Sequence, residues 1–350
     1  MKYKSHKVQP AENLEDISKK YDISIEDIKK ANPDVKIFKP MYGAEYVVAS
    51  QELKIPVFTK EEKTKEIALN SESFYPKARY RCSQNNLILI DGEPHFSCEI
   101  KTQYLYSILK ERNTTLRKIN LEDYITSIQP QNMQDAFELI KEIELLRNDV
   151  VFSDEENKIS KVYNFDSLSR KWKDFTKNKM NHIAFFKELK ERNPKSIQDF
   201  ISNGNKEFSN EKAFKEVIQK NLFYYVLLHS LNAEIKEFKL IQNSQIFPNI
   251  SLETNFIKTV VKEEELTTTY RLVGTLNKES LDDSILQNLY IQMYQPLIKF
   301  SYTEFDFVFR ITYTVENKTG ILKNVNVSIK EYIKNNYEII TKFDLKEVNL

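Results

Sequence analysis

The chain has 350 residues, and its 52 basic and 51 acidic side chains give a formal net charge of +1 at pH 7. This balance provides no electrostatic reason to expect binding to nucleic acid or to a membrane surface. Aromatic residues make up 12% of the chain, which favours well-filled cores over disorder. The length accommodates a small module together with one large domain or two smaller ones.

Glycine and cysteine usage restricts the class further. The five glycines are scattered, and no two lie within a phosphate-binding loop, which excludes Walker and dinucleotide-binding fingerprints. Cys82 and Cys98 are too few for a disulfide framework and fit a reducing compartment. The sequence shows no secretory or lipidation signal and no apolar run long enough to span a bilayer. We therefore expect a cytoplasmic protein, or one carried within a secreted or phage-like particle.

The first 57 residues are patterned as strand, helix, helix, strand. The segment from Tyr3 to Gln9 suits an edge strand, and Asn13 is a good N-cap with Asp16 three residues later. Apolar residues then recur at helical spacing. Ser24 is expected to cap a second helix, which Asn32-Pro33 ends. The closing strand is predicted from Val47, Val48, Leu53 and Ile55.

These residues resemble the LysM family. From Ala11 to Asn32 the chain reads AENLEDISKKYDISIEDIKKAN, and after a longer loop VVASQELKIP ends at Pro56. The family pattern is GDTL-x-x-IA-x-KY-x-VS-x-x-x-L-x-x-x-N, followed by GQ-x-L-x-IP. LysM modules usually bind polymers of N-acetylglucosamine, such as peptidoglycan or chitin. The resemblance covers residues 1–57, and the rest of the chain resembles no family that we can name.

The resemblance also implies where a glycan would bind. In the family, the glycan lies in a shallow groove between the loop before the first helix and the loop after the second helix. The first loop departs from the family pattern, because Ala11 stands in place of Gly, Glu12 in place of Asp, and Asn13 in place of Thr. Ser50 likewise replaces the Gly of the GQ turn. The matching groove positions are Ala11, Glu12, Asn13, Leu14, Asn32, Pro33 and Asp34.

The loop from Pro33 to Tyr46 is several residues longer than is usual in the family. It carries four apolar or aromatic side chains: Ile37, Phe38, Met41 and Tyr42. Exposed apolar side chains of this kind are typical of a surface that contacts another protein. Two interpretations stay open, a working glycan site whose sequence has drifted and a LysM fold redirected to a protein partner.

The chain after the module is predicted to form a second, larger domain. Residues 58–74 are charged and weakly patterned, and we interpret them as a linker. Residues 75–100 are predicted to form strands around a turn at Asp91–Pro94. Apolar stripes at helical spacing over 104–109, 137–146, 166–192 and 210–241 predict a helical region over 104–242.

The last hundred residues change to a strand pattern. Apolar and polar residues alternate from Phe305 to Glu316, and Asn317-Lys318-Thr319-Gly320 predicts a hairpin turn before the alternation resumes. We therefore expect an α+β protein, in which an N-terminal βααβ module precedes an α+β domain over 75–350. That domain is predicted to be an antiparallel meander packed with helices, mainly β over 250–350.

No catalytic or metal-binding pattern is recognisable. Cys82 lies in a strand-like context rather than at a helix start, and its nearest downstream histidine, His95, lies on the adjacent hairpin arm. The four histidines are scattered, without the spacing of zinc hydrolases. Paired carboxylates of a glycosidase cannot be identified among 51 acidic residues. We expect no cofactor, no metal and no enzymatic activity.

Three hypotheses on function follow. The first is a non-enzymatic adaptor or assembly protein, a component or chaperone of a bacterial contractile injection apparatus of the type VI or phage-tail kind, with another protein of that assembly as partner. The second is a protein that binds peptidoglycan or another N-acetylglucosamine polymer. The third is a degenerate cell-wall hydrolase. The missing export signal, the altered loops and the lack of catalytic motifs favour the first.

Overall fold

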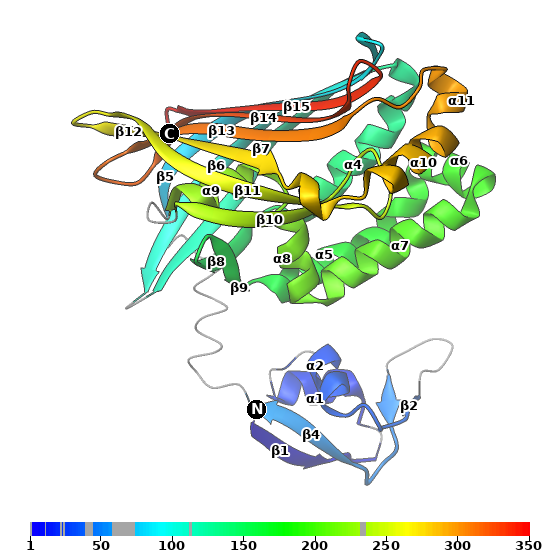
Figure 1. The fold of residues 1–350 in the computed structure, drawn as a ribbon. Helices are drawn as coiled ribbons and strands as arrows, with labels where there is room; N and C mark the ends of the chain where they lie inside the picture. Colours follow the sequence, from blue (N-terminus) through cyan, green and yellow to red (C-terminus); the bar gives the residue numbers. More distant parts are fainter. Residues whose placement is uncertain are drawn as a thin grey trace. The chain divides into compact units, whose positions relative to one another are not determined.

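The protein consists of two units, Met1–Glu72 and Ser73–Leu350 (Figure 1). Each unit has its own hydrophobic core. The structure is a computed structural model. It describes residues 2–10, 12–21, 23, 25–38, 45–57, 74–111, 114–231 and 236–350. Apart from Phe74, the expected linker 58–74 lies outside these residues, as do Ala11, Ser24, Met41 and Tyr42.

The smaller unit has a strand at each end and two helices between them. Strands β1 and β4 pair antiparallel, from Lys2 opposite Val57 to Lys7 opposite Glu52. A two-residue ladder, β2 with β3, was not expected from the sequence. Val48, which was assigned to the closing strand, lies outside both β3 and β4 and is exposed. The elements are β1 (Lys2–Lys7), α1 (Leu14–Tyr21), α2 (Ile25–Ala31), β2 (Ile37–Phe38), β3 (Tyr46–Val47) and β4 (Glu52–Val57).

Local sequence explains where the first helix begins. The backbone N–H of Asp16 donates to Asn13 Oδ1 at 2.9 Å, and the backbone N–H of Asn13 donates to Asp16 Oδ2 at 3.2 Å. This reciprocal pair satisfies two amide groups at the helix start. Leu14 and Ile17 then face the core, so that α1 is fixed on one side by apolar burial.

The larger unit is built on an 11-stranded sheet in which every recorded pairing is antiparallel. The strand order is β10-β11-β12-β13-β14-β15-β5-β6-β7-β8-β9, so β15 pairs with β5 and joins the two ends of the unit. The strands are β5 (Tyr75–Ile90), β6 (Glu93–Glu111), β7 (Thr114–Gln129), β8 (Val150–Glu155), β9 (Lys158–Val162), β10 (Glu237–Asn243), β11 (Ser251–Glu263), β12 (Thr267–Leu276), β13 (Phe305–Glu316), β14 (Leu322–Ile333) and β15 (Tyr337–Val348).

Helices connect the strands at two places in the chain, between β7 and β10 and between β12 and β13. In the first group, α5 and α6 are separated by a short irregular stretch, residues 175–183, that contains a π-helical and a 3₁₀ turn. The helices are α4 (Gln134–Leu146), α5 (Phe165–Asp174), α6 (Ala184–Arg192), α7 (Pro194–Ser209), α8 (Glu211–Ile218), α9 (Leu222–Leu231), α10 (Asp283–Met293) and α11 (Gln295–Ile298).

Helix α9 packs against strands from both halves of the sheet, and its aromatic side chains contact β5, β6, β8, β10 and β13. The ring of Phe223 stacks on Tyr104 of β6, with centroids 4.0 Å apart. At the other end of the helix, His229 stacks on Phe238 of β10 at 4.9 Å. A helix that is apolar on nearly all sides is stable only when it is surrounded in this way.

The predicted helical region, 104–242, is wrong in several places. Residues 104–129 belong to β6 and β7, because apolar residues on both faces of β6 imitate the spacing of a helix. The expected helix over 166–192 is broken, and Asn193 both ends α6 and caps α7 by accepting a hydrogen bond from Ser196 N at 3.2 Å. The region also contains β8, β9 and the first part of β10, whereas α10 and α11 lie in the segment expected to be mainly β.

Candidate functional site

Two loops of the smaller unit are brought together by the short strand β3. Tyr46 pairs with Phe38 of β2 on one side and forms an isolated bridge with Asn13 on the other. The backbone N–H of Leu14 also donates to Glu45 O at 2.8 Å. Residues 45 and 46 therefore lie between the loop that precedes α1 and the segment that follows α2, which are the two walls expected of a groove.

The loop before α1 is held by a partly buried polar network around Glu12. The Glu12 carboxylate accepts a hydrogen bond from Gln9 N at 2.8 Å, and its Oε2 lies 2.9 Å from His6 Nε2. His6 Nδ1 lies 2.9 Å from the Tyr21 hydroxyl, and Lys20 Nζ lies 3.7 Å from Glu12 Oε1. Partial burial acts to raise the pKa of Glu12, but the hydrogen bonds from Gln9 and His6 outweigh it and hold this pKa below its usual value.

The other two described positions of the first loop also face the protein. The Asn13 side chain caps α1, and Leu14 is buried in the core of the unit. The polar side chains of this loop are thus used internally. What the loop can offer to a ligand is a backbone of fixed shape, since side-chain hydrogen bonds hold it on both sides.

The segment after α2 places one predicted groove residue inside the protein and the others outside. Asn32 is only 8% exposed, and its Nδ2 donates to Ile28 O and Lys54 O, both at 2.7 Å. Its Oδ1 accepts from Lys54 N at 2.7 Å, so its amide joins α2 to β4. Pro33 and Asp34 are exposed.

The candidate protein-contact loop is described in part. Ile37 is half-buried against the core of the smaller unit, whereas the ring of Phe38 is 69% exposed. Met41 and Tyr42 lie outside the described residues. Phe38 is therefore a large, mostly exposed apolar side chain next to the two loops.

Comparison with known proteins identifies the smaller unit. Residues 6–38 match the family model of the LysM domain. This match confirms the resemblance drawn from the sequence, and the chain therefore contains a LysM domain. A comparison of the whole chain with curated proteins finds no match.

Sequence reasoning missed two contributors to this site. His6 was one of four scattered histidines, and its link to Glu12 exists because the loop returns to the end of β1. Tyr46 was placed only near the end of a long loop, without a partner. In both cases the signal is a tertiary contact, which the order of residues does not carry.

The cysteine considered as a catalytic nucleophile lies inside the larger unit. Cys82 is buried, and burial raises the pKa of its thiol, which keeps it protonated and unreactive. No group of three or more His, Cys, Asp or Glu side chains among the described residues is placed to hold a metal ion. No helix in the described ranges has both the length and the apolar character to cross a membrane.

Proposed function

We propose that the LysM unit binds a glycan chain that contains N-acetylglucosamine, at the loops on either side of Tyr46. The supporting observation is that Asn13 and Phe38 both pair with Tyr46, which holds the two loops as neighbours. The Glu12 and Asn32 side chains and the backbone N–H groups of residues 12, 13, 14 and 32 are engaged within the protein, and Pro33 has no N–H. The backbone groups that remain for an acetamido group include the N–H of Asp34 and the carbonyl of Pro33. The Phe38 ring supplies an apolar face for a sugar ring.

The proposal predicts a specific response to changes at Phe38. The full chain is incubated with insoluble peptidoglycan and, separately, with chitin, and the bound fraction is measured after sedimentation. Phe38→Ala is expected to weaken binding at least about tenfold, equivalent to about 1.4 kcal/mol. Phe38→Tyr keeps the flat face and is expected to bind like the parent. Tyr3→Ala, which removes an exposed aromatic of β1 outside both loops, is the matched control.

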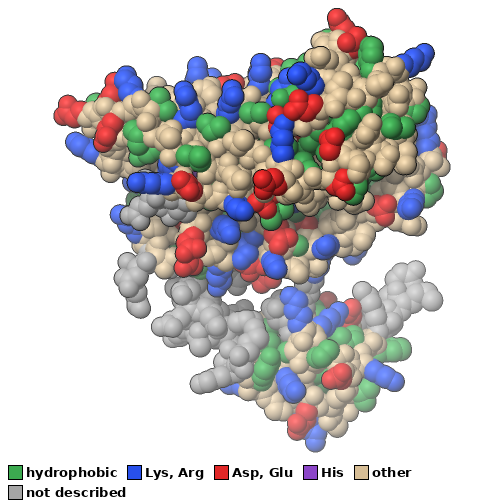
Figure 2. Space-filling model, viewed as in Figure 1, with side chains coloured by type: hydrophobic (Ala, Val, Ile, Leu, Met, Phe, Trp, Pro, Cys, Tyr) green, Lys and Arg blue, Asp and Glu red, His purple; other side chains and the backbone are tan. Residues whose placement is uncertain are grey.

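A second role, contact with another protein, is supported by an uncharged surface on the larger unit. Residues 284–298 contain no Asp, Glu, Lys or Arg, in a chain of which 29% is charged. Over most of the face seen in Figure 2, by contrast, acidic and basic side chains are interspersed. Depletion of charge is typical of the core of a protein interface. The stretch exposes four large apolar side chains: Ile285, Ile291, Met293 and Leu297, of which Leu297 is 80% exposed.

We infer from this surface that the chain is an adaptor, which binds glycan through the LysM unit and another protein through the larger unit. A component of a bacterial contractile injection apparatus would act in this way. Leu297→Glu is expected to release a protein that co-purifies with the full chain. Gln292→Glu, which changes an exposed polar residue outside the apolar set, is not expected to release it. A Phe38→Leu variant separates the two uses of the LysM loop. Leucine retains apolar contact with a protein but loses the flat face needed by a sugar.

Both roles are non-enzymatic. We propose that the chain does not cleave the glycan that it binds. Incubation of the full chain with purified peptidoglycan is expected to leave the amount of soluble saccharide and peptide unchanged. Release of soluble fragments at a rate that scales with protein concentration would contradict this proposal and favour a hydrolase.

A further inference from the structure

The larger unit contains a cavity of about 320 Å³ between the sheet and the helices α4, α8 and α9. Side chains of β5, β6, β7 and β15 form one wall, and residues 140–148 and 217–224 form the others. Ile140 and Lys220 line the cavity and are exposed, so this side of it faces solvent. The volume lies within the range of small-molecule sites.

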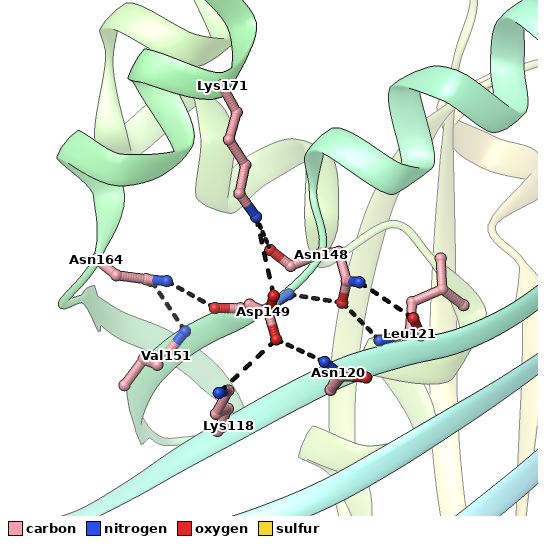
Figure 3. A network of polar contacts seen from close by, with 8 residues as sticks. All are labelled: Lys118, Asn120, Leu121, Asn148, Asp149, Val151, Asn164 and Lys171. Atoms are coloured by element: carbon pink, nitrogen blue, oxygen red, sulfur yellow. Dashed lines mark hydrogen bonds and ion pairs between the residues drawn. The ribbon is translucent and has the colours of Figure 1, made fainter. Parts of the chain in front are cut away.

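One rim of the cavity is rigid, because hydrogen bonds tie the end of α4 to β7 (Figure 3). Asn148 Oδ1 accepts from Leu121 N at 2.6 Å, and Asn148 Nδ2 donates to Leu121 O at 3.1 Å. Asp149 accepts from Asn120 Nδ2 at 2.6 Å, and Lys171 Nζ donates to Asn148 O at 3.0 Å. A rim that is fixed in this way is pre-formed for a ligand.

The charged groups at the cavity balance one another. Arg147 donates to both carboxylate oxygens of Glu207, at 2.7 and 2.8 Å, and its third contact is with Glu144. Lys220 also lines the cavity and supplies a second positive charge, whereas Glu207 is not among the lining residues. With Glu207 counted as the partner of Arg147, the two acidic and two basic groups sum to zero, which favours a ligand without net charge.

Two buried tyrosines bring unused hydroxyl groups to the same space. Tyr124 and Tyr224 line the cavity and are only 7% and 6% exposed. Within the described part of the chain, neither hydroxyl has a hydrogen-bond partner on the protein. Burial, and next the Glu144 carboxylate, raise the pKa of both, so they remain protonated and able to donate. Neither hydroxyl is among the fully buried polar atoms that lack a partner, so both are open to the cavity, where a bound polar group can accept from them.

We propose that this cavity binds a neutral, hydroxyl-rich ring compound of the size of a mono- or disaccharide. A ligand hydroxyl both accepts, as Tyr124 and Tyr224 require, and donates, as the Glu144 carboxylate requires. The apolar wall formed by Ile100, Ile119 and Phe343 matches the C–H face of such a ring. This site is independent of the LysM loops and does not rest on their proposed function.

The test uses Trp172, the single tryptophan of the chain, which lies in the larger unit. Urea unfolding of the full chain is followed by Trp172 fluorescence with N-acetylglucosamine, chitobiose or myo-inositol present. A ligand of the larger unit raises the urea midpoint of this transition in a saturable manner. We expect such a rise with at least one of the three compounds, and no rise with any of them would overturn the proposal.

Variants assign the binding to the cavity. Tyr224→Phe removes only the hydroxyl and is expected to weaken the interaction at least about tenfold. Tyr225→Phe is the control, because the Tyr225 hydroxyl is buried without a partner among the described residues and Tyr225 does not line the cavity. The rise is expected to persist in Phe38→Ala, which impairs only the LysM loops. An equal rise in Tyr224→Phe and the parent would refute the assignment.

Discussion

Replacing Gly204 with alanine tests the packing of α5 against α7 in the larger unit. A Cβ at this position would lie 2.2 Å from Cζ2 and 2.3 Å from Cη2 of Trp172. Carbon atoms in contact are separated by about 3.5–4.0 Å, so the ring or the helix has to move by more than about 1 Å. Trp172 has little room to move, because it is 3% exposed and stacks on Phe208 with ring centroids 5.2 Å apart.

Two opposing contributions set the size of the effect. In an open helix, Gly→Ala stabilises the protein by about 1 kcal/mol, whereas overpacking of a filled core costs about 1–3 kcal/mol. The distances place Gly204→Ala at the upper end of that cost, so we expect a net loss of about 1–2 kcal/mol in the free energy of unfolding. Urea unfolding followed by Trp172 fluorescence measures it.

Two further variants make this test specific. Ser202→Ala, on an exposed position of the same helix, is expected to be neutral or to stabilise by about 0.5 kcal/mol. In the Gly204→Ala variant, Trp172→Phe replaces the indole with a smaller ring. This second change is expected to restore part of the lost free energy of unfolding, as measured by circular dichroism. If Gly204→Ala instead stabilised the protein by the amount that helix propensity alone gives, the reasoning would be refuted.

Two more predictions concern the larger and the smaller unit. Burial, and next the charge of Lys258, lower the pKa of His229 from 6.5 to about 4. Protonation of His229 therefore favours the unfolded chain. The contribution of neutral His229 to the free energy of unfolding is complete above pH 6.5 and is lost as the pH falls toward 4, by about 3 kcal/mol in total. His229→Phe should flatten this part of the dependence of unfolding free energy on pH, and an unchanged slope would contradict it. Asn32→Ala removes three hydrogen bonds within the LysM unit. It should destabilise that unit by about 3 kcal/mol in NMR-monitored unfolding while the Trp172 transition stays unchanged, and a shift of the Trp172 midpoint would count against separate units.

The LysM unit could be predicted from the sequence because its signals are local. The cap at Asn13 and Asp16 lies within one helical turn, and Leu14 and Ile17 mark the buried face of the same helix. The role of Asn32 was not predictable, since its partner Lys54 lies 22 residues away and contacts it through backbone atoms. The sequence alone indicated a groove residue where the structure has an internal link.

In the larger unit, alternation predicted β13, β14 and β15 correctly because one face of each is buried and the other polar. Strand β6 does not show this alternation, because Tyr104 and Tyr106 face the core while Leu105 and Leu109 are half-buried on the opposite face. The cavity could not be predicted from the sequence for a different reason. Its walls combine residues as distant in sequence as Cys82 and Phe343, which meet only because β15 pairs with β5.

The most direct test of the proposed glycan site is a titration of the full chain, labelled with ¹⁵N, with soluble chitin oligomers. We predict saturable shifts of the backbone amide resonances of residues 12–14, 32–38 and 45–46, which lie along the two loops and the strand between them. The same titration of Phe38→Ala should require a higher oligomer concentration. Absence of any shift in these three segments, with the LysM unit folded, would contradict glycan binding by this domain.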